Sequence, residues 1–241
     1  MSDLFSGLGR KAASAMAKAK WTFTALTGTE EEALLAEKEL GAHMGKAFLE
    51  EVPLTDDREL SQLVHKTGEK LAGWISNRQR EFTFACIAMP EPNAIALPGG
   101  YIFVSVGLVE FCDRDINRLA GLIGHEIGHV VKNHTFERAV ASKLVQMLSK
   151  GAMFGGPIKR AAMGMVANLL SKGYSEDQEF EADVFGVRLA HSAGFHASGL
   201  IRFLQAVDMA GAGIRDVAFL DSHPKPADRV SNLRDSIGRS H

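Results

Sequence analysis

The sequence is short of cysteine, of long apolar runs and of net charge, and each shortage excludes a class of protein. Its 241 residues include two cysteines, Cys86 and Cys112. Two cysteines do not make a disulfide framework, so we expect both to be reduced, Cys86 in a strand and Cys112 at a helix end. A formal net charge of −2 carries no signature of nucleic-acid binding. We therefore expect no nucleic-acid partner.

No stretch has the apolar length of a transmembrane helix or of a signal peptide. The longest charge-free stretch, residues 92–109, contains a Pro-Gly-Gly break and alternates as a β-hairpin does. Lysines interrupt residues 1–25, where a signal peptide would lie. We expect a protein of the cytoplasm or of a membrane periphery. The cell envelope is the alternative if a targeting segment was removed.

The chain does have enough apolar sequence for a sizeable core. Hydrophobic residues make up 46% of it, and a chain of this length can fold without disulfides. Because no Pro/Ser-rich linker divides it, we expect an N-terminal amphipathic segment over residues 1–30 and one domain over residues 31–241. The N-terminal stripe suits a helix on a membrane surface, or one that docks on its own domain or on a partner chain.

Periodicity predicts a mainly helical protein. Helical patterns cover residues 31–51, 57–77, 114–134, 136–150, 158–171, 175–193, 197–210 and 226–236. Segments rich in β-branched and aromatic residues predict strands at 81–88 and 101–106, with a short one near 94–97. The expected fold class is α+β, a helical body with a small β-sheet.

The most informative motif is His125-Glu126-Ile127-Gly128-His129. It lies within a helical pattern, and residues four apart share one helix face, so His125 and His129 can direct two imidazole nitrogens at one metal ion. Glu126 lies about 100° around the helix, close enough to reach a water on that metal. Two neutral nitrogens and an adjacent carboxylate suit zinc-assisted hydrolysis of a peptide bond.

The alternative for this segment is an ordinary amphipathic core helix, since apolar residues line the face opposite the histidines. Gly121, Gly124 and Gly128, however, form a flank beside the histidines. Each glycine costs a helix roughly 1 kcal/mol relative to alanine. Three on one flank predict that something approaches the backbone closely there, which favours the metal-site interpretation.

Zinc in a protease needs a third protein ligand, and the fourth position is left to water. One candidate is His134, but the metzincin spacing would require histidine at position 135, so we expect His134 near the helix C-terminus instead. The better candidate is Glu179. It lies in a helix that Ser175 begins as N-cap, with Gln178 completing a capping box.

Glu179 shares a stripe of small residues with Asp183, and this stripe can pack against the glycine flank. Asp183, one turn on, is placed to accept an N–H from a ligand imidazole. Glu181 falls on the opposite side and is expected in solvent. The alternative is that the acidic run is only a solvated helix start, which the helix dipole would also favour.

Together these residues resemble a known family. His125-Glu126-x-x-His129 and Glu179-x-x-x-Asp183 look like the gluzincin zinc metallopeptidases that include HtpX, the CAAX prenyl protease and soluble quality-control proteases. Three further segments fit: the hairpin from Asn93 through Pro98-Gly99-Gly100, the element His223-Pro224…Arg229, and the domain entry at Leu40-Gly41. The resemblance covers residues 31–237. It implies a zincin-like metalloprotease domain with its sheet above the zinc-binding helix, one Zn²⁺ per chain, Glu126 as general base, and polypeptide substrates.

Two expectations concern the substrate and regulation. An edge strand can bind an extended peptide by main-chain pairing, and residues 101–106 are the candidate, with Asn93, Tyr101 and Phe103 as substrate-binding residues. The alternative is a buried strand without an open edge. The resemblance brings His223 towards the metal, where it would stabilise the oxyanion or bind zinc at rest and hold the enzyme latent. Its alternative is a structural loop histidine, and Arg229 is expected to pair with an acidic residue.

The predicted function is a zinc-dependent metalloendopeptidase of protein quality control, acting on unfolded or damaged proteins. One rival is a zinc-stabilised binding or chaperone-like module with a closed four-ligand site that includes His223. A second rival is a zinc hydrolase of non-peptide amides. A Gly-Gly-Pro break at residues 151–157, between two apolar helices, is expected to form a lid over the cleft.

Overall fold

The computed structural model describes residues 29–141, 173–211, 223 and 226–238. Three predictions lie outside the described residues: the amphipathic segment before residue 29, the helix at 158–171 and the lid at 151–157. The predicted helix at 136–150 lies outside them beyond residue 141.

A three-stranded sheet lies at the centre of the fold. Its strands are β1 (Thr83–Ile87), β2 (Ala94–Leu97) and β3 (Tyr101–Ser105), in the order β1-β3-β2. β3 is parallel to β1 and antiparallel to β2. The short 3₁₀ helix η1 (Pro98–Gly100) joins β2 to β3, and it needs glycine because Gly99 and Gly100 have φ angles of 73° and 86°.

This strand order shows that the edge-strand prediction was wrong. β1 and β2 occupy the two sides of β3, so residues 101–105 cannot pair with the main chain of a substrate. The sequence pattern could not show this, because β1 reaches β3 by parallel pairing and leaves β2, its nearer neighbour in sequence, on the far side. The outer strands of this sheet are β1, which Leu54 bridges at Ile87, and β2, whose residues are at most 2% exposed.

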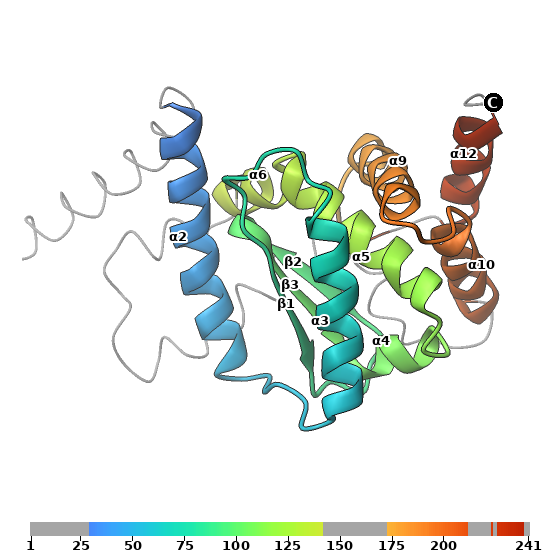
Figure 1. Ribbon diagram of the computed structural model, residues 1–241, viewed down its shortest axis with the longest axis horizontal. Helices are drawn as coiled ribbons and strands as arrows, with labels where there is room; N and C mark the ends of the chain where they lie inside the picture. The colour runs from blue at the N-terminus through green and yellow to red at the C-terminus, as the bar shows by residue number, and fades with distance from the viewer. Residues whose placement is uncertain (1–28, 142–172, 212–222, 224–225, 239–241) are drawn as a thin grey trace, which may run out of the picture.

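Helices cover both faces of the sheet (Figure 1). On one face lies α2 (Glu30–Leu49), whose Phe48 packs on Phe103 with ring centroids 5.2 Å apart. On the other lie α3 (Arg58–Ala72) and α5 (Ile116–Val131), which share a core with Ile102 and Val104. The alternation of side chains along β3 therefore serves two separate cores.

The other helices are α4 (Val106–Phe111), α6 (His134–Ala141), α9 (Glu176–Ser192), α10 (Gly199–Gly211) and α12 (Pro226–Gly238). Within the described ranges the predicted helices and strands are confirmed to within a few residues, with two exceptions. α3 ends at Ala72 rather than at residue 77, and α4 was not predicted. Ser105 caps α4 by accepting from the Leu108 amide at 3.0 Å, a signal hidden because Ser105 also ends β3.

α5 and α9 touch backbone to backbone. A Cβ on Gly124 would lie 2.9 Å from the carbonyl oxygen of Gly186, and one on Gly128 would lie 2.9 Å from that of Ala182. A Cβ on Gly186 would lie 2.5 Å from the amide nitrogen of His125. The predicted close approach at the glycine flank is thus confirmed, and the approaching element is α9 at Gly124 and Gly128 and α10 at Gly121.

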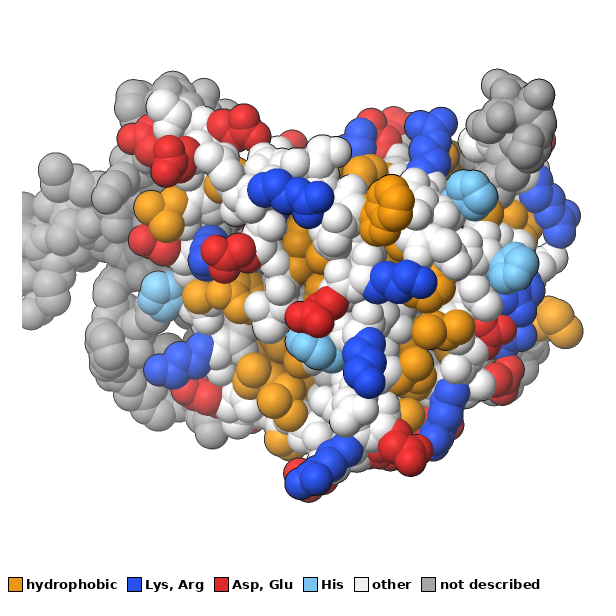
Figure 2. All heavy atoms as spheres, in the orientation of Figure 1, with side chains coloured by type: hydrophobic (Ala, Val, Ile, Leu, Met, Phe, Trp, Pro, Cys, Tyr) orange, Lys and Arg blue, Asp and Glu red, His pale blue; other side chains and the backbone are white. Residues whose placement is uncertain are grey.

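Cys86 and Cys112 are free and buried, as expected. Burial raises the pKa of Cys86 to about 11 and that of Cys112 to about 12, so both thiols stay protonated. Among the described helices, none has the length and apolar character needed to cross a membrane. On the face that Figure 2 shows, acidic and basic side chains are interspersed, in keeping with a net charge near zero.

Candidate metal centre

The motif helix α5 is defined at both ends by local signals. At its start the Asp115 carboxylate accepts from the amides of Asn117 and Arg118, at 2.8 and 3.2 Å. It ends at Val131 with Lys132 as C-cap, and Asn133 then takes a left-handed φ of 62°. His125 and His129 lie one turn apart on this helix, and both are fully buried.

α9 brings a carboxylate to the same place. The predicted capping box is present, because the Ser175 hydroxyl accepts from the Gln178 amide while the Gln178 side chain accepts from the Ser175 amide. The close contact with α5 then places Glu179 and Asp183 beside the histidines, both about 1% exposed.

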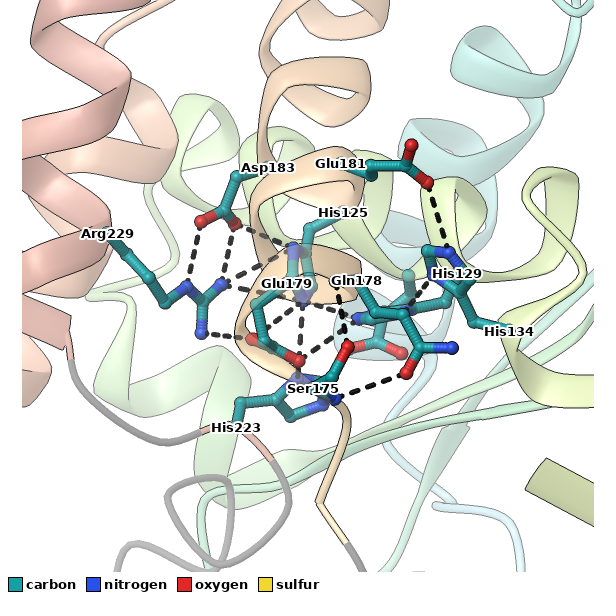
Figure 3. A network of polar contacts seen from close by, with 11 residues as sticks. His125, His129, His134, Ser175, Gln178, Glu179, Glu181, Asp183, His223 and Arg229 are labelled. Carbon is teal, nitrogen blue, oxygen red and sulfur yellow. Dashed lines mark hydrogen bonds and ion pairs between the residues drawn. The ribbon is translucent and has the colours of Figure 1, made fainter. Parts of the chain in front are cut away.

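Four buried side chains converge at this point: His125, His129, Glu179 and His223, each with a ligand atom within 4.8 Å of the others (Figure 3). The Nε2 atoms of His125 and His129 are 3.1 Å apart, and Glu179 Oε1 lies 3.4 Å from His129 Nε2. His223 Nδ1 lies 2.8 Å from Glu179 Oε1. Sequence reasoning named all four, and the structure brings all four together.

This donor set fits zinc. Imidazole nitrogens and a carboxylate oxygen are ligands that zinc prefers. Burial, together with the neighbouring His125 and His223 rings, lowers the pKa of His129 well below its usual value, so the imidazole is neutral, as a ligand must be. Glu126 Oε1 is buried without a hydrogen bond, and Glu179 Oε1 lies 3.4 Å from His129 Nε2 and 2.8 Å from His223 Nδ1, so carboxylate oxygens are directed at the site.

Glu126 lies beside the cluster and not within it. Its Oε1 is 3.6 Å from His223 Nε2, and its side chain is about 1% exposed. A buried carboxylate next to a metal site, yet outside the ligand set, suits the handling of a proton.

Asp183 and Arg229 support the site from behind. Asp183 Oδ1 lies 2.8 Å from His125 Nδ1, so Nδ1–H donates to it and the lone pair of Nε2 is left for a metal. Arg229 donates to both oxygens of Asp183, at 2.6 and 2.8 Å, and its Nη1 lies 2.8 Å from Glu179 Oε2. Burial alone would raise the pKa of Asp183, but Arg229 and His125 hold it below its usual value. The expected pairing of Arg229 with an acidic residue is confirmed.

His134 takes a role that the sequence did not suggest. It is the first residue of α6, and its Nδ1 lies 3.1 Å from His129 Nδ1 while its Nε2 lies 3.3 Å from Glu181 Oε2. Glu181, with 55% of its side chain exposed, is therefore engaged with His134 rather than simply solvated. Extending α5 as a regular helix through residue 134 would not predict this contact, because the left-handed conformation of Asn133 changes the direction of the chain.

The three substrate candidates lie in different settings. Asn93, directly before β2, is buried, and its Oδ1 has no hydrogen bond. Phe103 is buried against Phe48, so it contributes to a core, and Tyr101 is half-buried near the glycines of α2. Sequence reasoning also missed Tyr174 and Arg138, which stack beside His129.

A separate hollow of about 930 Å³ lies between α2, α9 and the end of α3. Apolar side chains such as Leu34, Trp74 and Phe136 line it, and none of the four clustered residues does. The residues able to bind a metal therefore lie in the buried cluster and not around this mostly apolar hollow.

Comparisons with known proteins agree with this geometry. A sequence model described as peptidase family M48 matches residues 58–237. Over 216 residues the chain is 26% identical to the β-barrel assembly-enhancing protease of Escherichia coli K12, covering 82% of this chain and 43% of that protein. It is 29% identical to the metalloprotease YcaL of the same organism, covering 61% of this chain and 59% of YcaL.

A mitochondrial relative shows a similar extent of likeness. The mitochondrial metalloendopeptidase OMA1 of Schizosaccharomyces pombe is 28% identical over 152 residues, covering 61% of this chain and 44% of OMA1. In each of these comparisons the chain spans less than two thirds of the relative's own length.

Proposed function

Because this chain belongs to peptidase family M48, we propose that it is a zinc-dependent endopeptidase whose metal is held by His125, His129 and Glu179. The observation that carries this proposal is the buried convergence of these side chains with His223. Zinc bound in such a set lowers the pKa of a water ligand and polarises the scissile carbonyl.

Each neighbouring residue then has a task. Glu126 takes the proton of the attacking water and later delivers it to the leaving amine, and its buried Oε1, which lacks a hydrogen bond, is the atom that does so. Asp183 holds His125 in the required tautomer, and Arg229 keeps Asp183 ionised. Removing either contact would let the His125 imidazole change its orientation or its tautomer.

We propose that His223 closes the site at rest. It is 2% exposed and lies 2.8 Å from Glu179 Oε1 and 3.3 Å from His125 Nε2, inside the cluster where a substrate carbonyl has to enter. Withdrawal of the ring would admit the substrate. From a short distance the same imidazole would then stabilise the oxyanion.

The substrates we propose are polypeptides, held in extended form along β2. The middle position of β3 excludes that strand, whereas β2 is an outer strand that begins directly after Asn93 and contacts α5. Because its residues are at most 2% exposed, a substrate would bind there only after the groups that cover β2 move away. Main-chain pairing recognises the backbone more than the sequence, which suits unfolded or damaged proteins. The unbonded Oδ1 of Asn93 would accept from the substrate main chain.

The test measures zinc content and casein cleavage of the purified chain, with and without a chelator. Glu126→Gln should keep one zinc per chain, because Glu126 is not a ligand, and should lower cleavage by about 10²–10⁴-fold. Loss of zinc in this variant would contradict the assigned role.

The casein assay, together with a small-amide substrate, separates the rivals. A non-catalytic module would bind zinc but show no chelator-sensitive cleavage, in the wild type and in His223→Ala alike. A hydrolase of non-peptide amides would hydrolyse small amides while leaving casein intact. We expect chelator-sensitive cleavage of casein.

A further inference from the structure

Tyr174 packs directly on one of the proposed ligands. It lies two residues before the start of α9, is 6% exposed, and stacks its ring on the imidazole of His129. The ring centroids are 3.6 Å apart and the planes differ by 14°. This is face-to-face contact at van der Waals distance over the whole imidazole.

Arg138, on α6, covers the other face of Tyr174. Its guanidinium carbon lies 3.8 Å from the centroid of the Tyr174 ring. His129 already occupies one face at a similar distance, and two groups cannot share that space, so the guanidinium lies on the opposite face. His129, Tyr174 and Arg138 therefore form a three-layer stack, which we call the His129 stack.

Polar atoms of the His129 stack are buried without hydrogen bonds. They are Arg138 Nε, Arg138 Nη1 and the Tyr174 hydroxyl, none of which finds a partner in the described part of the chain. Leaving such groups unpaired is costly. The contact that remains to the buried part of Arg138 is the cation–π contact with the ring, an attraction that strengthens when the cation is desolvated.

His129 needs such support more than His125 does. His125 is held by the ionised Asp183, which Arg229 clamps from behind. On the Nδ1 side of His129, the partner that the described part of the chain provides is the imidazole of His134, 3.1 Å away, and not a carboxylate clamped by an arginine. The hydrogen bond of His125 to the carboxylate of Asp183 is charge-assisted, and such bonds are about twice as strong as ordinary ones.

The His129 stack restrains the tilt of the imidazole plane, which the hydrogen bond to His134 does not. The lone pair of Nε2 lies in the plane of the imidazole, so the tilt of the plane decides where the lone pair points. The bond to His134 leaves the ring free to tilt about it, whereas parallel stacking opposes any tilt. We infer that Tyr174 and Arg138 are positioning residues that hold the plane of His129 towards the metal. This inference rests on the proposed function, in which His129 is a zinc ligand.

The test changes the ring and the cation separately. Tyr174→Phe keeps the stack and should leave zinc affinity within about 2-fold of the wild type. Tyr174→Leu removes it and should weaken zinc binding by about 10- to 100-fold, the usual effect of losing a contact behind a metal ligand. Arg138→Met keeps the ring but not the cation, and should weaken zinc binding by about 2- to 10-fold.

Two readouts separate positioning from a general loss of structure. Zinc affinity comes from competition with a chromophoric chelator, and the visible absorption of the Co²⁺-loaded protein reports ligand geometry. Tyr174→Leu should shift the Co²⁺ spectrum while Tyr174→Phe should not. If Tyr174→Leu fails to fold, as judged by circular dichroism, Arg138→Met tests the same stack with its ring in place.

Phe195→Leu is the matched control. Phe195 is a buried aromatic, 7% exposed, with the Lys70 ammonium 4.3 Å from its ring centroid, and it lies outside the metal cluster. Its replacement removes a similar cation–π pair and should leave zinc affinity and the Co²⁺ spectrum unchanged. An equal loss in Phe195→Leu and Tyr174→Leu would overturn the inference.

Other outcomes overturn it in distinguishable ways. Unchanged zinc affinity in Tyr174→Leu and Arg138→Met, with His129→Ala still losing zinc, removes the stack from the site and leaves the proposed function intact. If Tyr174→Phe keeps zinc but loses turnover, the hydroxyl acts on the substrate and positioning is wrong. If His129→Ala itself keeps full zinc affinity, the proposed function fails.

Discussion

At the scale of single residues, the orientation of two acidic side chains on one helix decides which of them can hold a metal. Glu179 is 1% exposed and lies among three histidines. Glu181, two residues on, has a half-exposed side chain that pairs with His134. Position on the helix, and not charge, separates a proposed ligand from a supporting residue.

Glu179→Ala should weaken zinc binding by more than about 100-fold, beyond what the loss of a contact behind a ligand costs. Glu181→Ala is the matched control, since it removes the same charge from the same helix and should change affinity by only a few-fold through His134. Zinc titration of the two variants side by side measures the difference. Equal affinities would remove Glu179 from the ligand set.

His223 has two proposed roles with opposite signs on mutation. If the ring mainly closes the resting site, His223→Ala should raise basal peptide cleavage. If it mainly stabilises the oxyanion, the same change should lower cleavage by about 10²–10³-fold. We expect a rise, because the ring lies 2.8 Å from Glu179 inside a fully buried cluster. Initial rates on a fluorogenic peptide decide between the two.

At the scale of elements, the site depends on how closely α5 and α9 approach. Ridges of ordinary side chains would hold two helices 8–10 Å apart. Here glycine at 124, 128 and 186 lets backbone meet backbone, which brings Glu179 to the same depth as His129. The proposed metal site therefore depends on the short distance between α5 and α9.

Gly124→Ala tests this dependence. A Cβ would lie 2.9 Å from the Gly186 carbonyl, so the helices must separate, and we expect a destabilisation of about 1–3 kcal/mol with weaker zinc binding. Gly45→Ala in α2 is the control, because its Cβ would meet nothing closer than 3.6 Å. That change should stabilise the protein by up to about 1 kcal/mol. Chemical denaturation of both variants measures the change in the free energy of unfolding, which should be negative for Gly124→Ala and positive for Gly45→Ala. A stabilised Gly124→Ala would contradict the packing argument.

At the scale of the whole molecule, the cluster joins parts of the chain that are distant in sequence. The proposed ligands come from α5 and α9, with His223 contributed from just before α12. A metal that binds the folded chain and not the unfolded one stabilises it by mass action.

Removing zinc should therefore lower the unfolding temperature of the whole domain. At a free zinc concentration of 1,000 Kd the stabilisation is about 4 kcal/mol, which a thermal melt with and without chelator would detect. Glu179→Ala serves as the control: with zinc affinity more than about 100-fold weaker, its stabilisation at the same free zinc is at most about 1.4 kcal/mol, so the chelator should lower its melting temperature much less. A chelator effect of equal size in that variant would place the zinc elsewhere.

Local patterns determined most of the site and much of the fold. The spacing of His125 and His129, the capping box at Ser175 and the stripe shared by Glu179 and Asp183 follow from the period of a single helix, which a sequence displays directly. The three glycines at 121, 124 and 128 also predicted that another element would pack closely against α5.

Only the tertiary structure decided how distant segments combine. The middle position of β3 depends on which strands pair, and the contacts of His134 and Tyr174 depend on the left-handed turn at Asn133 and on the approach of α9. Strand order and the stacking of rings from separate helices have no periodic signature, because they arise from long-range packing. Hence the sequence determined which side chains can form the buried cluster, and the tertiary structure decided which strands lie outermost and which side chains pack behind the cluster.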